Sequence, residues 1–105
     1  MSPNDARPAP TDTTATAVRR SCTICNQKGL HARAAARFCK TAAQFDSEIW
    51  VRKNGTAVSG RSIMGLMMLA AGPGTTITVT ASGKDAQAVM AALAELVCGR
   101  FTEDE

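Results

Sequence analysis

The run Lys28–Arg33 holds the residue types that suit transfer of a phosphoryl group. It contains His31, the only histidine in the chain, which stands two residues after Gly29 and two residues before Arg33. A neutral imidazole is a good nucleophile near pH 7, because its unperturbed pKa is about 6.5. An arginine guanidinium presents donors whose geometry matches phosphate oxygens. These residues predict a site at which His31 accepts and releases a phosphoryl group.

His31 stands where a strand-like segment gives way to a helical pattern. The helix is predicted to end near Gln44, and its apolar positions fall three and four residues apart: Ala32, Ala35, Phe38, Cys39, Ala42 and Ala43. The N-terminus of a helix offers free N–H groups and partial positive charge to an anion, so we expect the backbone amides of Ala32 and Arg33 to contact phosphate. Residues two apart on a helix do not face each other, so Arg33 can help only if His31 is the cap.

Four strands and two further helices are predicted around this helix. The strands are expected at 19–26, 48–52, 56–60 and 75–81, with alternate side chains toward the core: Cys22, Ile24, Ile49, Val51, Val58, Ile77, Val79 and Ala81. Asn54-Gly55 predicts a hairpin between the second and third strands. Ser62 caps a second helix that Gly72-Pro73-Gly74 ends. The last helix has an apolar stripe of Ala88, Val89, Ala92, Leu93, Leu96 and Val97.

The element order β-α-β-β-α-β-α predicts an α+β fold. Its form is a two-layer open-faced sandwich, with a four-stranded antiparallel sheet and three helices on one face. Residues 1–18 are rich in Pro, Thr, Ala and Asp without apolar periodicity, so we expect a disordered N-terminal extension before a domain at 19–105.

Composition argues against several classes of partner. The net charge of +3 is mild, and aromatic residues make up 4% of the chain, which weakens a nucleic-acid function. No run approaches the roughly 18 apolar residues of a membrane span. The N-terminus carries acid and proline where a signal peptide would have a basic stretch and an apolar core. We therefore expect a cytoplasmic protein that binds neither nucleic acid nor a membrane.

The four cysteines do not predict a metal or redox site. Cys22 and Cys25 have the spacing of zinc knuckles and redox motifs, but a strand would send their thiols to opposite faces. Cys39 and Cys98 fall in helical patterns, where a free cysteine is usually a small buried hydrophobe. We expect no metal ion and no bound cofactor.

Two separated motifs resemble the HPr family, the histidine-containing phosphocarriers of the bacterial phosphotransferase system, and its nitrogen-related branch. They are Gly29–Arg33 and Gly60–Leu66, and the resemblance extends from about Arg19 to Phe101. It implies that His31 takes a phosphoryl group from enzyme I, itself phosphorylated by phosphoenolpyruvate, and passes it to an enzyme IIA. The protein would then be a carrier and not an enzyme. The family often has proline directly after the arginine, and Ala34 at this position favours the nitrogen-related branch.

The second motif predicts a regulatory site and a partner surface. The resemblance implies that Ser62 is the target of an HPr kinase/phosphorylase, in addition to capping its helix. The apolar residues after Ser62 are too many for one buried stripe, so we expect some of them to meet partners. The predicted partner surface comprises Lys28, Arg37, Arg61, Ile63, Met64, Leu66 and Met67. Its positive residues, together with Arg33, would steer acidic partners.

Two other function classes are weighed against a phosphocarrier. A histidine-dependent hydrolase is disfavoured, because a lone histidine without a Ser/Asp or Cys partner motif makes no triad. A small α+β ligand- or partner-binding regulatory domain without phosphotransfer is the alternative, since a fold does not fix a function. We expect a monomer, because a carrier presents one face to successive partners.

Overall fold

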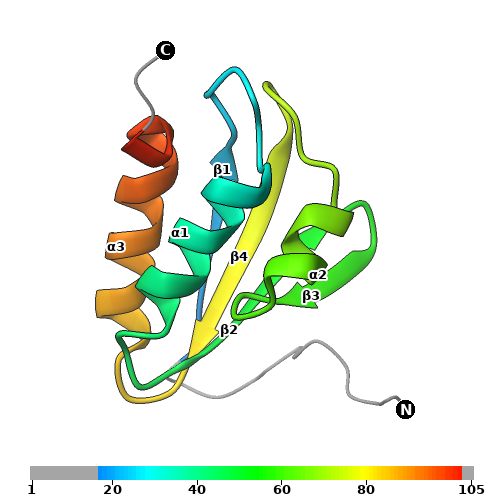
Figure 1. The fold of residues 1–105 in the computed structure, drawn as a ribbon. Coiled ribbons are helices and arrows are strands. Elements are labelled where there is room, and N and C mark those ends of the chain that lie inside the picture. Colours follow the sequence, from blue (N-terminus) through cyan, green and yellow to red (C-terminus); the bar gives the residue numbers. More distant parts are fainter. Residues whose placement is uncertain (1–16, 103–105) are drawn as a thin grey trace.

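Four antiparallel strands form the sheet of this computed structural model, which describes residues 17–102 (Figure 1). They are β1 (Val18–Thr23), β2 (Glu48–Lys53), β3 (Thr56–Ser59) and β4 (Thr76–Ser82), in the spatial order β1-β4-β2-β3. The last strand in the chain therefore lies inside the sheet, between β1 and β2. Its register pairs Ile77 with Cys22 and Val79 with Val51, which places these buried side chains on one face.

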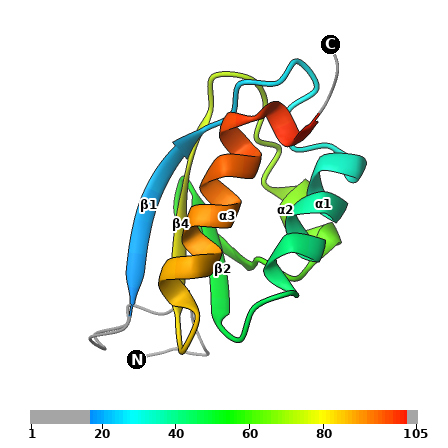
Figure 2. The ribbon, with the colours of Figure 1, turned by 90° about the vertical axis from the view of Figure 1, so that its left-hand side faces the viewer.

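Three helices cover that face and leave the other face of the sheet open (Figure 2). They are α1 (Ala32–Ala42), α2 (Ile63–Met68) and α3 (Ala86–Cys98), and a 3₁₀ turn, η1 (Arg100–Thr102), follows the last helix. The apolar residues that alternate along β2 and β4 are buried between the two layers. The predicted α+β sandwich and its element order are confirmed.

The hairpin between β2 and β3 has the predicted turn. Asn54 and Gly55 both adopt positive φ, of 49° and 85°, as a two-residue turn that matches the twist of the strands requires. This turn sets the register in which Val51 pairs with Val58. Because the side-chain period of a strand is two, the same register keeps Val51 on the core face.

Two predicted boundaries were wrong. β1 ends at Thr23 and not at Asn26, because Asn26 already accepts a hydrogen bond from Gly29 N–H (3.2 Å) in the turn that leads to α1. α2 ends at Met68, well before Gly72, because Ala70 takes the left-handed conformation (φ 51°) that breaks the helix. The sequence had predicted that Gly72-Pro73-Gly74 would end this helix.

The buried faces of two helices are rotated from the predicted ones. In α1, Ala32 and Ala43 are exposed, and the buried residues are Ala34, Ala35, Phe38 and Ala42. In α3, Ala88 is exposed, and the buried residues are Ala86, Val89, Met90, Leu93, Ala94 and Val97. The face of α3 is wide because this helix packs against β1, β4 and α1 at once.

The predicted disordered extension falls mostly outside the described residues. Of the range 1–18, only Ala17 and Val18 are described, and Val18 is the first residue of β1, so this strand begins one residue before the predicted domain boundary. Within residues 17–102, no helix is both long enough and apolar enough to cross a bilayer.

Candidate functional site

His31 caps the N-terminus of α1, as the sequence predicted. Its backbone is extended (φ −84°, ψ −176°), and its carbonyl accepts the first helical hydrogen bond from Ala35 N–H at 2.8 Å. Its side chain folds over the helix end, where Nδ1 accepts a hydrogen bond from the backbone N–H of Arg33 at 3.3 Å. A ring nitrogen that accepts a hydrogen bond carries a lone pair and no proton. The Nδ1 lone pair of His31 is therefore directed at the amides of α1.

The first turn of α1 offers further donors beside the imidazole. Within the described part of the chain, the backbone N–H groups of Ala32 and Ala34 meet no hydrogen-bond acceptor. These groups and the helix dipole give the surroundings of Nδ1 a partial positive charge. Ala34 is fully buried and lies within the regular turn of α1. Its N–H is a donor that a proline at this position would lack.

A short loop holds His31 in place. Gly29 has φ 64°, and a Cβ on it would lie 2.5 Å from the carbonyl oxygen of Ala71. The next residue, Leu30, donates its N–H to that same oxygen at 2.8 Å. The buried Asn26 side chain donates from Nδ2 to Gly29 O at 2.8 Å. The loop before α1 is thus fixed onto the segment that follows α2. Sequence reasoning missed the parts that Asn26 and Ala71 play in it, because no local pattern indicates them.

The three arginines predicted near the site have different roles. Arg33 is exposed at the start of α1. Arg37 is half-buried, and its Nη1 donates a hydrogen bond to the carbonyl oxygen of Phe101, so this arginine joins α1 to the C-terminal turn. Arg61 donates from Nη2 to the carbonyl oxygens of Phe45 at 3.0 Å and Ser47 at 2.9 Å.

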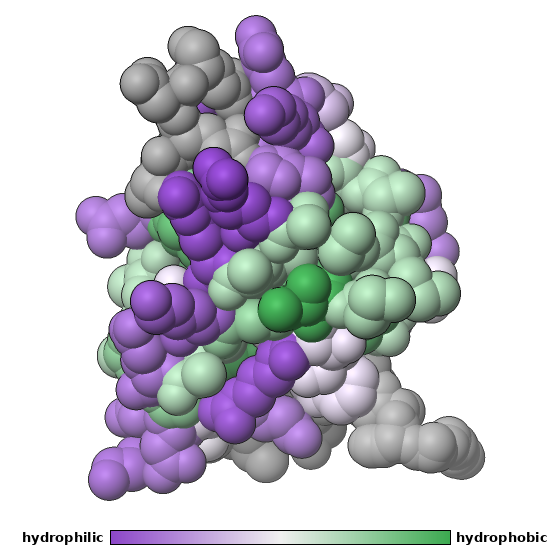
Figure 3. Space-filling model, in the orientation of Figure 1, coloured by the Kyte–Doolittle hydropathy of each residue, from purple (hydrophilic) through white to green (hydrophobic). Residues whose placement is uncertain are grey.

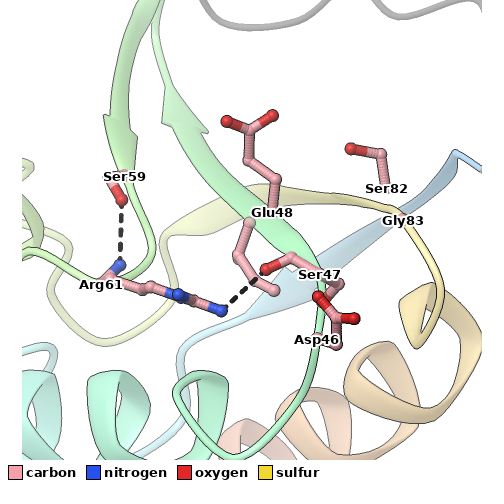
Figure 4. A pocket seen from close by; sticks show the side chains of 8 residues that line it. Asp46, Ser47, Glu48, Ser59, Arg61, Ser82 and Gly83 are labelled. Atoms are coloured by element: carbon pink, nitrogen blue, oxygen red, sulfur yellow. Dashed lines mark hydrogen bonds between the residues drawn. The ribbon is translucent and has the colours of Figure 1, made fainter.

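Arg61 is engaged at the loop between α1 and β2. Figure 4 shows it reaching across a surface depression of about 520 Å³ toward Ser47, at the loop between α1 and β2. Its guanidinium is hydrogen-bonded to that loop, and the assignment of exposed Arg61 to the partner surface stays a prediction. Lys28, by contrast, is exposed in the loop before His31, as expected.

Ser62 caps α2 as predicted. Its Oγ accepts a hydrogen bond from Gly65 N–H at 2.9 Å, and its carbonyl accepts one from Leu66 N–H at 3.0 Å. The side chain is only half-buried, so the hydroxyl lies near the surface.

Four apolar side chains of α2 are exposed to solvent. They form what we call the α2 patch: Ile63 (42% exposed), Met64 (70%), Met67 (40%) and Met68 (77%). Figure 3 shows apolar surface gathered over α2 next to strongly hydrophilic side chains. Leu66 is fully buried, so its assignment to the partner surface was wrong: it is the one residue of α2 that faces the core. Met68, which the predicted surface omitted, is the most exposed of the four.

An open-faced sandwich whose first helix is capped by a histidine, with an arginine in the same turn, is the arrangement expected from the resemblance to the histidine phosphocarriers. The family described as "PTS HPr component phosphorylation site" matches residues 18–98. The chain therefore belongs to the HPr family of phosphocarrier proteins, whose members carry phosphoryl groups and are not themselves catalysts.

Named relatives agree with this assignment. The chain is 51% identical to phosphocarrier protein HPr of Neisseria meningitidis, over 84% of this chain and 99% of that protein. It is 43% identical to phosphocarrier protein NPr of Shewanella violacea, over 84% of this chain and 97% of that one. The crystal structure of HPr from Thermoanaerobacter tengcongensis superposes with a TM-score of 0.80 at 39% identity, covering 84% of this chain and 99% of that chain.

The contact between Gly29 and Ala71 predicts a matched pair of variants. Gly29→Ala should lower the free energy of unfolding by about 1–2 kcal/mol for the left-handed φ and by about 1–3 kcal/mol more for the overlap with Ala71 O. Gly74→Ala should show only the first effect, because Gly74 also has positive φ (85°) but nothing lies within 4 Å of its Cβ. Urea denaturation measures both, and equal losses would contradict the account of this loop.

Proposed function

We propose that His31 accepts a phosphoryl group on Nδ1 from phosphorylated enzyme I and passes it to an enzyme IIA. The hydrogen bond from Arg33 N–H to Nδ1 carries this proposal, because it identifies the ring nitrogen whose lone pair faces the helix amides. In the first transfer, the bond from phosphorus to enzyme I breaks as a bond from phosphorus to Nδ1 forms. The phosphoryl group then leaves from the same nitrogen to the next acceptor.

Electrostatics around Nδ1 favour a bound phosphoryl dianion. A helix N-terminus stabilises anions through its free N–H groups and its dipole. The Arg33 amide meets Nδ1, and the amides of Ala32 and Ala34 belong to the same first turn, so we propose that all three contact the phosphoryl oxygens. The Arg33 side chain is exposed and starts in the same turn, so its guanidinium can reach the phosphoryl oxygens once they are present.

The α2 patch supports docking to more than one partner. Its methionines are flexible and polarisable, and such side chains adapt to differently shaped surfaces. α2 packs against α1, and the loop before His31 is bonded to the segment after α2, so patch and imidazole belong to one surface region. We propose that enzyme I and enzyme IIA use this region in turn, with Lys28 and Arg33 attracting acidic side chains at its edge.

The phosphoryl-acceptor role predicts a covalent adduct on one residue. Incubation of the protein with enzyme I and phosphoenolpyruvate should add one phosphate, which intact-mass analysis detects and mild acid removes. His31→Ala should abolish the adduct. An adduct that persists in this variant would contradict the proposal, and absence of any adduct would favour a regulatory binding domain.

A variant of a second exposed arginine distinguishes a specific role of the Arg33 side chain from an effect of net charge. Charge-assisted hydrogen bonds contribute about 1.5–3 kcal/mol, so Arg33→Gln should slow phosphorylation about 10- to 100-fold. Arg52→Gln removes an equally exposed arginine from β2, where the neighbouring Val51 faces the core and Arg52 faces the open side of the sheet. This variant should leave the phosphorylation rate unchanged. An equal loss of rate in both variants would contradict a specific role of Arg33, because each variant removes one positive charge.

We also propose that Ser62 is phosphorylated by an HPr kinase/phosphorylase. Its hydroxyl is near the surface beside the α2 patch, where a phosphate of nearly two negative charges would alter docking. The N-terminus of α2 would tolerate that charge, because its free amides and dipole favour anions.

Capping and phosphorylation at Ser62 are distinguished by two variants. Ser62→Ala should lose about 1 kcal/mol of stability together with the cap, and it should accept no phosphate from the kinase. Ser62→Asn keeps a capping oxygen without a hydroxyl, so it should remain near wild-type stability and still accept no phosphate. Kinase incubation followed by peptide mapping tests this, and a phosphoserine found elsewhere would contradict the assignment.

A further inference from the structure

The side chain of one exposed cysteine lies against the backbone of another at the end of the sandwich where residues 26–30 lead into α1. Cys25 follows β1, and Cys98 is the last residue of α3, 73 positions later. The thiol of Cys25 donates to the carbonyl oxygen of Val97 at 3.6 Å and to that of Cys98 at 3.8 Å. Both ribbon views place the loop after β1 next to the C-terminal end of α3 (Figures 1 and 2). The Cys25 sulfur thus lies against the backbone of the second cysteine.

The chain around Cys98 can adjust to bring the two sulfurs together. Disulfide formation needs Cβ atoms about 3.5–4.5 Å apart, and because the backbone sets that separation, any approach of Cys98 to Cys25 has to come from movement at the end of α3. Cys98 ends its helix and is followed by Gly99, and Arg100 and Phe101 both have positive φ. The last turn of a helix lacks part of its hydrogen-bond ladder and moves more easily than the interior.

The other two thiols are shielded. Cys22 is only 7% exposed on the core face of β1, and burial raises the pKa of its thiol, an effect that Arg20 partly offsets and that the nearby Cys98 thiol reinforces. Burial likewise raises the pKa of the half-buried Cys39 in α1. Because the thiolate is the reactive species, these two cysteines are poor participants in exchange. Cys25 and Cys98 are both exposed and reachable by an oxidant.

We propose that Cys25 and Cys98 form a reversible disulfide by exchange with a small-molecule disulfide such as oxidised glutathione. One cysteine thiolate attacks the oxidant, which releases one thiol and leaves a mixed disulfide. The second thiolate attacks the protein sulfur of that mixed disulfide, which releases the other thiol. Two cysteines are oxidised and one disulfide is reduced, so atoms and electrons balance.

The disulfide would join the start of the loop before α1 to the turn that follows α3. On one side, Cys25 immediately precedes Asn26, whose side chain holds Gly29. On the other, Cys98 leads into the turn whose Phe101 carbonyl is bonded to Arg37 of α1. An exposed disulfide of this kind is labile, as a redox-responsive link has to be. It also closes a long loop and should raise the midpoint of urea unfolding.

Tryptic mapping without reduction tests the pairing. The fully reduced protein is incubated with oxidised glutathione, quenched with acid, alkylated and digested. The expected product is Ser21–Lys28 linked to Asp85–Arg100, which disappears after dithiothreitol treatment. The first peptide contains both Cys22 and Cys25, so variants assign the bond. Cys22→Ser and Cys39→Ser should retain the linked peptide, and Cys25→Ser and Cys98→Ser should lose it.

Three results would overturn the proposal, and none of them depends on phosphotransfer. They are a linked peptide that persists in Cys25→Ser, a covalent dimer in place of an intramolecular bond, and glutathione adducts that never proceed to a protein disulfide. Urea unfolding of each reduced variant serves as the folding control. Loss of the link in Cys25→Ser counts as support only when this variant unfolds at the same urea concentration as Cys39→Ser or at a higher one.

Discussion

The hydrogen bond between Arg33 N–H and His31 Nδ1 is the contact on which the rest of the site depends. It fixes the imidazole as the cap of α1, and it selects the ring nitrogen that faces the helix amides. That geometry requires the chain to turn sharply before the helix, which the contact between Gly29 and Ala71 achieves. The sheet contributes by holding α1 and α2 side by side on one face, so that this contact can form.

The caps of α1 and α2 share one construction but offer different chemistry. His31 and Ser62 both have extended backbone, and each accepts a hydrogen bond from an amide in the first turn of its helix. An imidazole in that position offers a nucleophile, whereas a hydroxyl offers a group that a kinase can modify. α2 has only six residues, and only Leu66 is buried, so its remaining apolar side chains are available to partners.

Much of the fold followed from local patterns in the sequence. Alternation in β2 and β4, the Asn54-Gly55 turn and the two polar caps each have a local physical cause, and each is present in the structure. Contacts between segments that are distant in the chain did not follow from such patterns. Nothing near Arg61 in the chain shows that its guanidinium meets the carbonyl oxygen of Ser47. In the same way, the pairing of Cys25 with the end of α3 depends on how β1 packs against that helix, which periodicity does not reveal.

The position of the phosphate on the imidazole ring tests the central claim most directly. After phosphorylation by enzyme I and phosphoenolpyruvate, protein labelled with ¹⁵N in histidine is studied by ³¹P and ¹⁵N NMR. Because His31 is the only histidine, one set of ring signals reports the answer. The account predicts that phosphorus is coupled to Nδ1, the nitrogen that accepts the Arg33 amide in the free protein. Phosphate on Nε2 would contradict it, since that nitrogen is not the one directed at the helix N-terminus.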